Sequence, residues 1–145
     1  MIRVESGDLA EVLSTLSLPE GGLVFVANST VSDEWPAVLD ELTAAFELSQ
    51  DAIRSGGPIV YVLEGDDLLG RRGPGSAMVA CGLLSAARTL ALEAARAGVP
   101  VNVLAVGATS TSESVRFWVE ALCDRNGPNG ELIRLGADHL GKALP

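Results

Sequence analysis

The stretch from Ser76 to Gly107, SAMVACGLLSAARTLALEAARAGVPVNVLAVG, constrains the fold of this chain more than any other segment. It predicts a long helix, Pro74–Ala97, followed by a short buried strand, Val101–Ala105. The surface of this helix is made of small and apolar residues on nearly every side, above all in its first half. Its few charges all lie in its second half: Arg88, Glu93 and Arg96. Because such a helix must bury two sides, the stretch requires a layered fold.

Short apolar runs and helical periods alternate along the rest of the chain. Strands are predicted at four further runs: Ile2–Glu5, Leu23–Ala27, Ile59–Leu63 and Glu131–Leu135. Helices are predicted at three further segments: Leu9–Leu16, Asp33–Arg54 with Ser32 or Asp33 as its cap, and Ser112–Cys123. The alternation predicts an α/β fold, in which helices cover both faces of a mostly parallel sheet of about five strands. A length of 145 residues corresponds to one domain.

The composition disfavours several classes of partner. The formal net charge of -9 argues against binding to nucleic acid, whose phosphates attract Lys and Arg, and against an anionic membrane surface. No apolar run reaches the roughly 20 residues of a membrane span, and the N-terminus lacks a signal-peptide pattern. We therefore expect a soluble, cytoplasmic protein with no nucleic-acid or membrane partner.

Residues that form disulfides or bind transition metals are few. Cys81 and Cys123 lie far apart in apolar helical segments, which predicts two buried, reduced thiols. Neither these cysteines nor the single histidine, His139, has a partner at metal-ligand spacing. We therefore expect no metal site built on these residues.

The surface of the long helix has two interpretations. The helix is either fully internal and covered by a loop, or one of its sides forms an oligomer interface, because an exposed apolar stripe of that size would be sticky. We favour the interface, formed together with the helix Asp33–Arg54. The residues expected in it are apolar: Trp35, Phe46, Met78, Leu83, Leu84, Ala87 and Leu90.

Five segments carry a family resemblance. They are LVFVANST (Leu23–Thr30), the helix from Ser32 to Ile53, GGPIVYVLEG (Gly56–Gly65), RTLALEAARAGVPVNVLAVG (Arg88–Gly107) and NGELIRLGADHLGKAL (Asn129–Leu144). In this order they resemble the C-terminal half or more of the short-chain dehydrogenase/reductase family, and the fourth segment is the most specific. The resemblance implies a partial Rossmann-like, three-layer α/β domain.

The resemblance also implies where a family member keeps its catalytic residues, and this chain has other residues there. Ser76 stands at the tyrosine position and Ala80 at the lysine position. Glu64 stands at the position of the strand serine, and the helix asparagine falls near Glu41. A serine hydroxyl is a poor proton donor near neutral pH, and a carboxylate has the wrong sign to stabilise an oxyanion. We therefore expect no catalytic residues and no enzymatic activity.

The sequence also lacks the cofactor-binding half of the family. A family member has a glycine-rich turn after its first strand, which holds the pyrophosphate of NAD(P). Here Ile2–Glu5 is followed by Ser6, Gly7 and Asp8, which provide one glycine and an acid. About two strand–helix units are missing relative to the family. We therefore expect no cofactor and a single truncated domain over residues 1–145.

Two polar clusters allow other interpretations. Arg71 and Arg72 precede the long helix and form a candidate anion site for a phosphate or a coenzyme A tail, and the alternative is a solvated loop. Glu64, Asp66 and Asp67 offer oxygen ligands for Mg²⁺ or Ca²⁺, and the alternative is a charged rim. We favour the second interpretation in both cases.

The functional expectation follows from what the resemblance keeps and loses. In the family, the two long helices commonly form the main dimer interface as a four-helix bundle. We therefore expect a non-catalytic subunit that pairs through these helices, either with itself as a homodimer or with an active dehydrogenase or reductase. The alternative is a small-molecule or acyl-CoA binding module without redox activity. A third hypothesis is a non-redox enzyme that uses Glu64 as a base.

Overall fold

A computed structural model describes residues 1–4 and 8–136 of the chain. Its centre is a sheet of five parallel strands, which lie side by side in the order of the sequence. The strands are β1 (Ile2–Arg3), β2 (Leu23–Val26), β3 (Ile59–Glu64), β4 (Val101–Val106) and β5 (Leu132–Leu135). All five predicted strands are confirmed, with small shifts at their ends.

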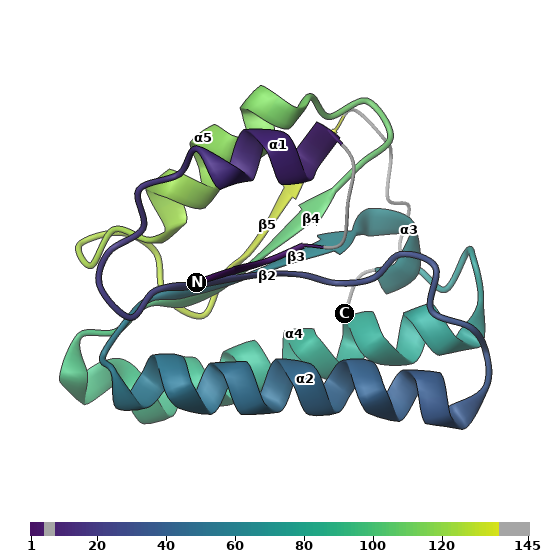
Figure 1. The fold of residues 1–145 in the computed structure, drawn as a ribbon, viewed down its shortest axis with the longest axis horizontal. Coiled ribbons are helices and arrows are strands. Elements are labelled where there is room, and N and C mark those ends of the chain that lie inside the picture. Colours follow the sequence, from purple (N-terminus) through teal and green to yellow (C-terminus); the bar gives the residue numbers. More distant parts are fainter. Residues whose placement is uncertain (5–7, 137–145) are drawn as a thin grey trace.

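Helices cover both faces of the sheet, so the molecule has three layers (Figure 1). The two long helices, α2 (Trp35–Arg54) and α4 (Pro74–Ala94), pack on one face, and a 3-10 turn (Ala95–Ala97) extends α4. The shorter helices, α1 (Asp8–Ser14) and α5 (Ser112–Leu122), pack on the other face. A one-turn helix, α3 (Gly65–Leu68), follows β3 directly. The α/β fold predicted from the sequence is confirmed.

The four crossover connections do not share one handedness. Each connection joins one strand to the next strand along the sheet, and all four proceed across the sheet in the same direction. A connection whose helix lies on one face therefore has the opposite handedness from a connection whose helix lies on the other face. The connections through α2 and α4 are right-handed, whereas those through α1 and α5 are left-handed (Figure 1). Right-handed crossovers are the rule in about 98% of such units. The direct β1–α1–β2 connection is therefore an unusual feature.

Burial of the strands on both faces explains their uninterrupted apolar sequences. In β3, Ile59, Tyr61 and Leu63 face α2 and α4, whereas Val60 and Val62 face α1 and α5. Side chains of successive strand residues point to opposite faces, so a strand between two helix layers needs apolar residues at every position. The Val- and Leu-rich runs therefore occupy the centre of the sheet.

A hydrogen bond links the segment before α2 to the N-terminus of α4. The sequence pattern predicted Ser32 or Asp33 as the cap of α2, but the side chain of Asp33 does not cap this helix. Its Oδ1 instead accepts a hydrogen bond of 2.8 Å from the backbone N–H of Gly75 in the first turn of α4. An aspartate at a helix N-terminus accepts a hydrogen bond from a backbone N–H that has no partner within the helix, and its negative charge is stabilised by the positive end of the helix dipole. The segment before α2 thereby positions α4.

The α4 helix is long and apolar enough, by length and composition alone, to cross a membrane, contrary to the expectation from the sequence. Over Pro74–Ala97 its most apolar window has a mean hydropathy of 1.4 and is 44% buried inside the chain. Nine residues of α4 are buried, including Val79, Leu83 and Ala91. The core helix of a layered α/β fold has these same properties, so they are weak support for a membrane span.

Some predicted features lie outside the described residues. These are His139, the Ser6–Gly7 part of the turn after β1, and the end of the Asn129–Leu144 segment beyond residue 136. Their predictions stay untested.

Candidate functional site

Five large apolar side chains of α2 and α4 are exposed; one of them, Leu92 near the C-terminal end of α4, is 80% exposed, and the other four lie in α2 and in the N-terminal part of α4. Trp35, Leu39 and Phe46 of α2 and Met78 of α4 are between 44% and 65% exposed. On α2 the spacing of these residues places them on one stripe, because residues three, four and seven apart share a helix face. We call these four residues the apolar outer face. Large apolar side chains exposed on one side of a molecule are a mark of an interaction site.

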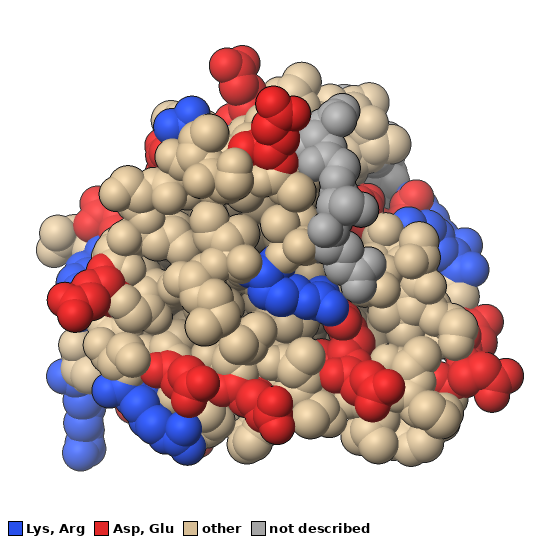
Figure 2. All heavy atoms as spheres, in the orientation of Figure 1, with Lys and Arg blue, Asp and Glu red and all other residues tan. Residues whose placement is uncertain are grey.

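Charged residues lie beside the apolar outer face. On α2 the exposed carboxylates Asp40, Glu47 and Asp51 follow a helical spacing that turns them away from α4. Figure 2 shows acidic side chains along the edge of the molecule where α2 lies. The apolar outer face therefore has an acidic border on its α2 side.

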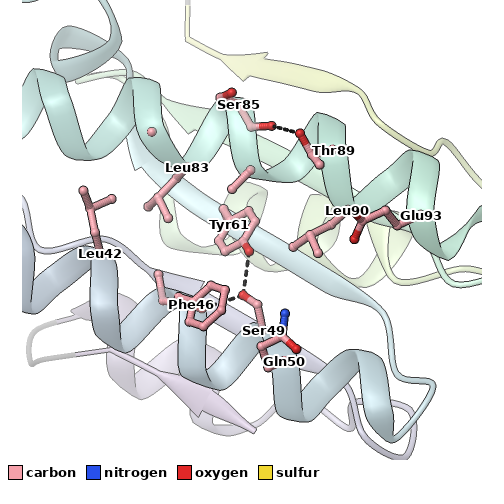
Figure 3. A pocket seen from close by; sticks show the side chains of 13 residues that line it. Leu42, Phe46, Ser49, Gln50, Tyr61, Leu83, Ser85, Thr89, Leu90 and Glu93 are labelled. Carbon is pink, nitrogen blue, oxygen red and sulfur yellow. Dashed lines mark hydrogen bonds between the residues drawn. The ribbon is translucent and has the colours of Figure 1, made fainter.

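A groove of about 370 Å³ runs between α2 and α4 (Figure 3). Phe46 and Leu90 line it from the two helices, and Gly82 brings the helices close, because a Cβ atom there would lie 3.1 Å from a Leu42 methyl group. The volume is in the range of sites that accept a side chain or a small ligand. The groove gives the apolar outer face a concave part next to the exposed Phe46 ring.

A hydrogen-bonded pair closes the groove at the sheet. The Oγ of Ser49 donates to the carbonyl of Ala45 at 2.6 Å, so its single proton is used and the Tyr61 hydroxyl donates to Oγ at 2.6 Å. Burial raises the pKa of Tyr61. The pair satisfies both buried hydroxyls, so the base of the groove is stable without a ligand.

The structure divides the predicted interface residues into two groups. Trp35, Phe46 and Met78 are exposed, and Leu90 is half-buried at the groove. A second group is at most 8% exposed and belongs to the core beneath α4: Leu83, Leu84 and Ala87. These three residues are therefore not part of the exposed side of α4 that the interface prediction requires, although Leu83 also lines the groove. Leu39 was missed, although its spacing from Trp35 and Phe46 on α2 indicates the same stripe.

The two cysteines differ in environment. Cys123 is buried, as predicted, but Cys81 is exposed on α4, so its predicted burial is wrong. Burial raises the pKa of Cys123 to about 11.

We expect the thiols of Cys81 and Cys123 to be alkylated at different rates in the folded protein. The thiolate is the reactive form, so at pH 8 Cys123 reacts slowly both because it is buried and because its thiol stays protonated. Iodoacetamide should modify Cys81 first, and mass spectrometry of peptides after a short exposure checks this. Equal labelling of both cysteines in the folded chain would contradict the buried placement of Cys123.

The positions that correspond to the family's tyrosine and lysine are buried. Ser76 lies in the first turn of α4, where its hydroxyl donates to the carbonyl of Gly73 at 3.4 Å. Ala80 lies one turn further on in the core. Neither position presents a proton donor or a cation to an open cleft.

The position that corresponds to the helix asparagine forms a structural ion pair. Glu41 of α2 is 6% exposed, and its two oxygens accept from both terminal nitrogens of Arg3, at 2.7 and 2.6 Å. Its Oε1 also accepts from the backbone N–H of Asn28, and Arg3 donates to the carbonyl of Val26. A bidentate arginine–carboxylate pair is among the stronger protein contacts. Glu41 thus joins β1, the end of β2 and α2.

Glu64 ends β3 at the edge of the sheet where the carboxyl ends of all five strands meet. Burial raises the pKa of its carboxyl, and the positive charge of Arg72 opposes part of that shift. Glu64 lines a small hollow of about 70 Å³ with residues that follow β3 and β4 and with Arg134 of β5. Ligands of open α/β sheets bind at this edge.

The candidate anion site at Arg71 and Arg72 is not supported. Arg71 forms an ion pair of 2.9 Å with Asp66, and Arg72 forms a bidentate pair with the buried carboxylate of Asp67. In the first turn of α4, Pro74 has no N–H, and the N–H groups of Gly75 and Ala77 already donate to the Asp33 carboxylate and to the carbonyl of Gly73. Sequence inspection missed the pairing, although both carboxylates stand five residues before their arginines.

The same ion pairs determine whether the acidic cluster of Glu64, Asp66 and Asp67 could bind a cation. Asp66 and Asp67 bind arginines, which leaves Glu64 as the only carboxylate of the three without an ion pair in the described structure. Across residues 1–4 and 8–136, no group of three or more His, Cys, Asp or Glu side chains is arranged to hold a metal ion. The cluster is a charged rim built from salt bridges.

The class of fold follows from comparison with solved structures. Over 78% of the chain, the structure matches 61% of an acetoin dehydrogenase from Enterobacter cloacae, with a TM-score of 0.65 and 19% identity. It matches 66% of an acetoin dehydrogenase from Salmonella typhimurium (TM-score 0.65, 18% identity, 88% of this chain). It also matches 64% of a citronellol catabolism dehydrogenase from Pseudomonas aeruginosa PAO1 (TM-score 0.61, 22% identity, 88% of this chain).

These neighbours are short-chain dehydrogenases, so the chain has a Rossmann-like fold of the short-chain dehydrogenase/reductase type. It spans just under two thirds of the length of those proteins. No protein-family model and no curated protein sequence matches the chain. At these identities the comparison establishes the fold alone.

Proposed function

We propose that the chain is a non-catalytic subunit of the short-chain dehydrogenase/reductase type, which associates through the apolar outer face of α2 and α4. Its partner is a second copy of the chain or an active dehydrogenase or reductase of the same fold. The observation that carries the proposal is the exposure of Trp35, Leu39, Phe46 and Met78 on the outward side of α2 and α4, where Phe46 also lines a groove. Aromatic residues beside a hollow are typical of interface hot spots.

The residues at the family's catalytic positions support the non-catalytic part of the proposal. A buried serine hydroxyl at Ser76 and a methyl group at Ala80 provide neither the acid nor the charge that hydride-transfer chemistry on a carbonyl requires. The carboxylate of Glu41 is committed to Arg3. These residues stabilise the fold.

The left-handed β1–α1–β2 connection supports the absence of the cofactor half. In a doubly wound fold, right-handed units extend the sheet outward from the first strand before the chain returns to the other side of that strand. If those outer units were removed, the helix that follows the first strand would lead directly to the strand on the other side of the first strand. That helix would lie on the face of the sheet opposite α2, and the connection would be left-handed. The connection through α1 has this geometry.

A titration with NADH and NADPH tests the missing cofactor half. We expect no saturable change in nicotinamide fluorescence, because the turn after β1 has one glycine where a pyrophosphate site needs several. An active dehydrogenase measured in the same buffer is the control. Micromolar binding of either nucleotide would contradict this part of the proposal.

The acyl-CoA alternative loses its main support because Arg71 and Arg72 are paired with Asp66 and Asp67. We retain the subunit as the single proposed function. We also propose a cytoplasmic location, because the apolar side of α4 is used by the sheet and by the proposed partner.

Co-purification tests the subunit itself. The tagged chain, co-expressed with dehydrogenases from its own genome, should be recovered as a stable homomeric or heteromeric complex. Recovery of monomer alone, with no effect on the activity of any co-expressed dehydrogenase, would contradict the proposal.

A further inference from the structure

The acidic border of the apolar outer face contains two carboxylates without a local partner. Asp51 forms an ion pair of 3.1 Å with Arg54 on the same helix. Asp40 and Glu47 are exposed and form no ion pair in the described part of the chain. Seven residues of helix separate them, so they lie on the same side of α2, about 10 Å apart along its axis. Two unmatched negative charges at a fixed spacing therefore border the apolar outer face.

The exposed charges of α4 and of the turn that extends it lie at one end of the layer. They are two arginines and one glutamate: Arg88, Glu93 and Arg96. Both long helices run in the same direction, and the hydrogen bond from Gly75 to Asp33 holds their N-termini together. Asp40 is therefore level with the first half of α4, which has no charged residue.

A second copy of the chain matches this charge pattern poorly. Two identical faces meet around a twofold axis, and its two simplest directions are across the helices and along them. An axis across the helices brings α2 against α2 of the second copy, so the two acidic borders meet. An axis along the helices brings α2 against α4 and keeps the level of each residue, so Asp40 meets no positive charge. Like charges that face each other across an interface disfavour association.

We propose that the apolar outer face binds a different protein whose matching face has a border of Lys or Arg, in preference to a second copy of this chain. The proposal rests on the proposed association through α2 and α4, and it adds the chemistry of the partner. Apolar side chains of the partner cover the apolar outer face, and its cations meet Asp40 and Glu47. The net charge of -9 contributes less than this border, because salt screens charges beyond about 8 Å.

The charge-reversed chain Asp40→Lys/Glu47→Lys is the probe, because it has the same apolar outer face with a basic border. Both substitutions lie at exposed positions and leave the core unchanged. We expect the wild-type chain to bind this variant at least about tenfold more tightly than it binds itself. Sedimentation velocity of the two chains, separate and mixed, with a fluorescent label on one of them, measures both affinities. The difference should shrink between about 50 and about 500 mM sodium chloride, because salt screens exposed charges.

Glu11→Lys/Glu113→Lys is the matched control. It changes the net charge by the same amount, on α1 and α5 at the other face of the sheet. Glu11 and Glu113 are exposed and form no ion pair in the described residues. The wild-type chain should bind this control at most about twofold more tightly than it binds itself. An equal gain with both variants would overturn the proposal, because net charge rather than the acidic border would then select the partner.

The outcomes separate this proposal from the proposed function. A wild-type chain that binds itself as tightly as it binds the charge-reversed chain would overturn the proposal and leave the subunit intact. Monomers in every sample, including those with co-expressed dehydrogenases, would contradict the association itself. A dehydrogenase that co-purifies with the wild-type chain should bind the charge-reversed chain at least about tenfold more weakly. Equal binding of that dehydrogenase to the two chains would also overturn the proposal.

Discussion

Replacement of Glu41 with alanine should lower the free energy of unfolding by about 2 to 4 kcal/mol. The substitution leaves the guanidinium of Arg3 and the backbone N–H of Asn28 without the carboxylate that they contact, and it detaches β1 from α2. Breaking a buried pair costs more than the pair contributes, because the remaining charge stays partly desolvated. Arg3 is a quarter exposed, which keeps the loss below the upper end of the range for fully buried pairs. Urea denaturation followed by circular dichroism measures the change.

Glu47→Ala is the matched control for this prediction. Glu47 lies on the same helix but is exposed and has no ion pair in the described structure. Its loss should change the free energy of unfolding by less than about 0.5 kcal/mol. Similar losses for the two variants would show that Glu41 is not the link between β1 and α2.

The double variant Phe46→Asp/Met78→Asp should weaken association of the chain by at least about 30-fold. Both side chains are exposed in the single chain, so the substitutions place charges on the apolar outer face without entering the core. Burying two unpaired carboxylates against a partner would be costly. Sedimentation velocity over a range of concentrations measures the change, and the thermal unfolding of the variant should stay close to that of the wild type.

Phe117→Asp provides the control on the opposite face. Phe117 of α5 is 64% exposed, almost the same as Phe46, but it lies on the other side of the sheet. Association should be unchanged in this variant. An equal loss of association in both variants would show that the aspartates act by a general effect. Leu83→Asp is unsuitable, because Leu83 is in the core and the variant would unfold.

The sequence predicts the sheet well because burial on two faces leaves a strong pattern. Strands such as Ile59–Glu64 are apolar at nearly every position and are bounded by turn residues. The order of strands and helices then leaves few ways to build the sheet. The handedness of the β1–α1–β2 connection was not predictable, because no residue in α1 indicates which face it covers.

The sequence predicts the faces of α4 poorly for a physical reason. Polar residues normally mark the side of a helix that faces water, but the first half of α4 has none with charge. Leu83, Leu84 and Ala87 therefore look equivalent to Met78 in sequence, although they face the sheet. On α2 the charges Asp40 and Glu47 mark the outer border, so the exposure of Trp35 and Phe46 could be predicted from the sequence.

The polar contacts were mostly hidden from the sequence because they are long-range. Arg3 and Glu41 are 38 residues apart, and Asp33 and Gly75 are 42 residues apart. No local pattern links such pairs, which meet only after the sheet has formed. The pairs of Arg71 and Arg72 are local, and inspection of the residues five positions earlier would have found them.

Sedimentation velocity of the wild-type chain, alone and mixed with co-expressed dehydrogenases, tests the central claim most directly. The proposed docking through α2 and α4 predicts a stable species larger than a monomer in at least one of these samples, and its loss in Phe46→Asp/Met78→Asp. A wild-type chain that remains monomeric in every sample at high concentration would contradict the account, because the apolar outer face would then have no partner.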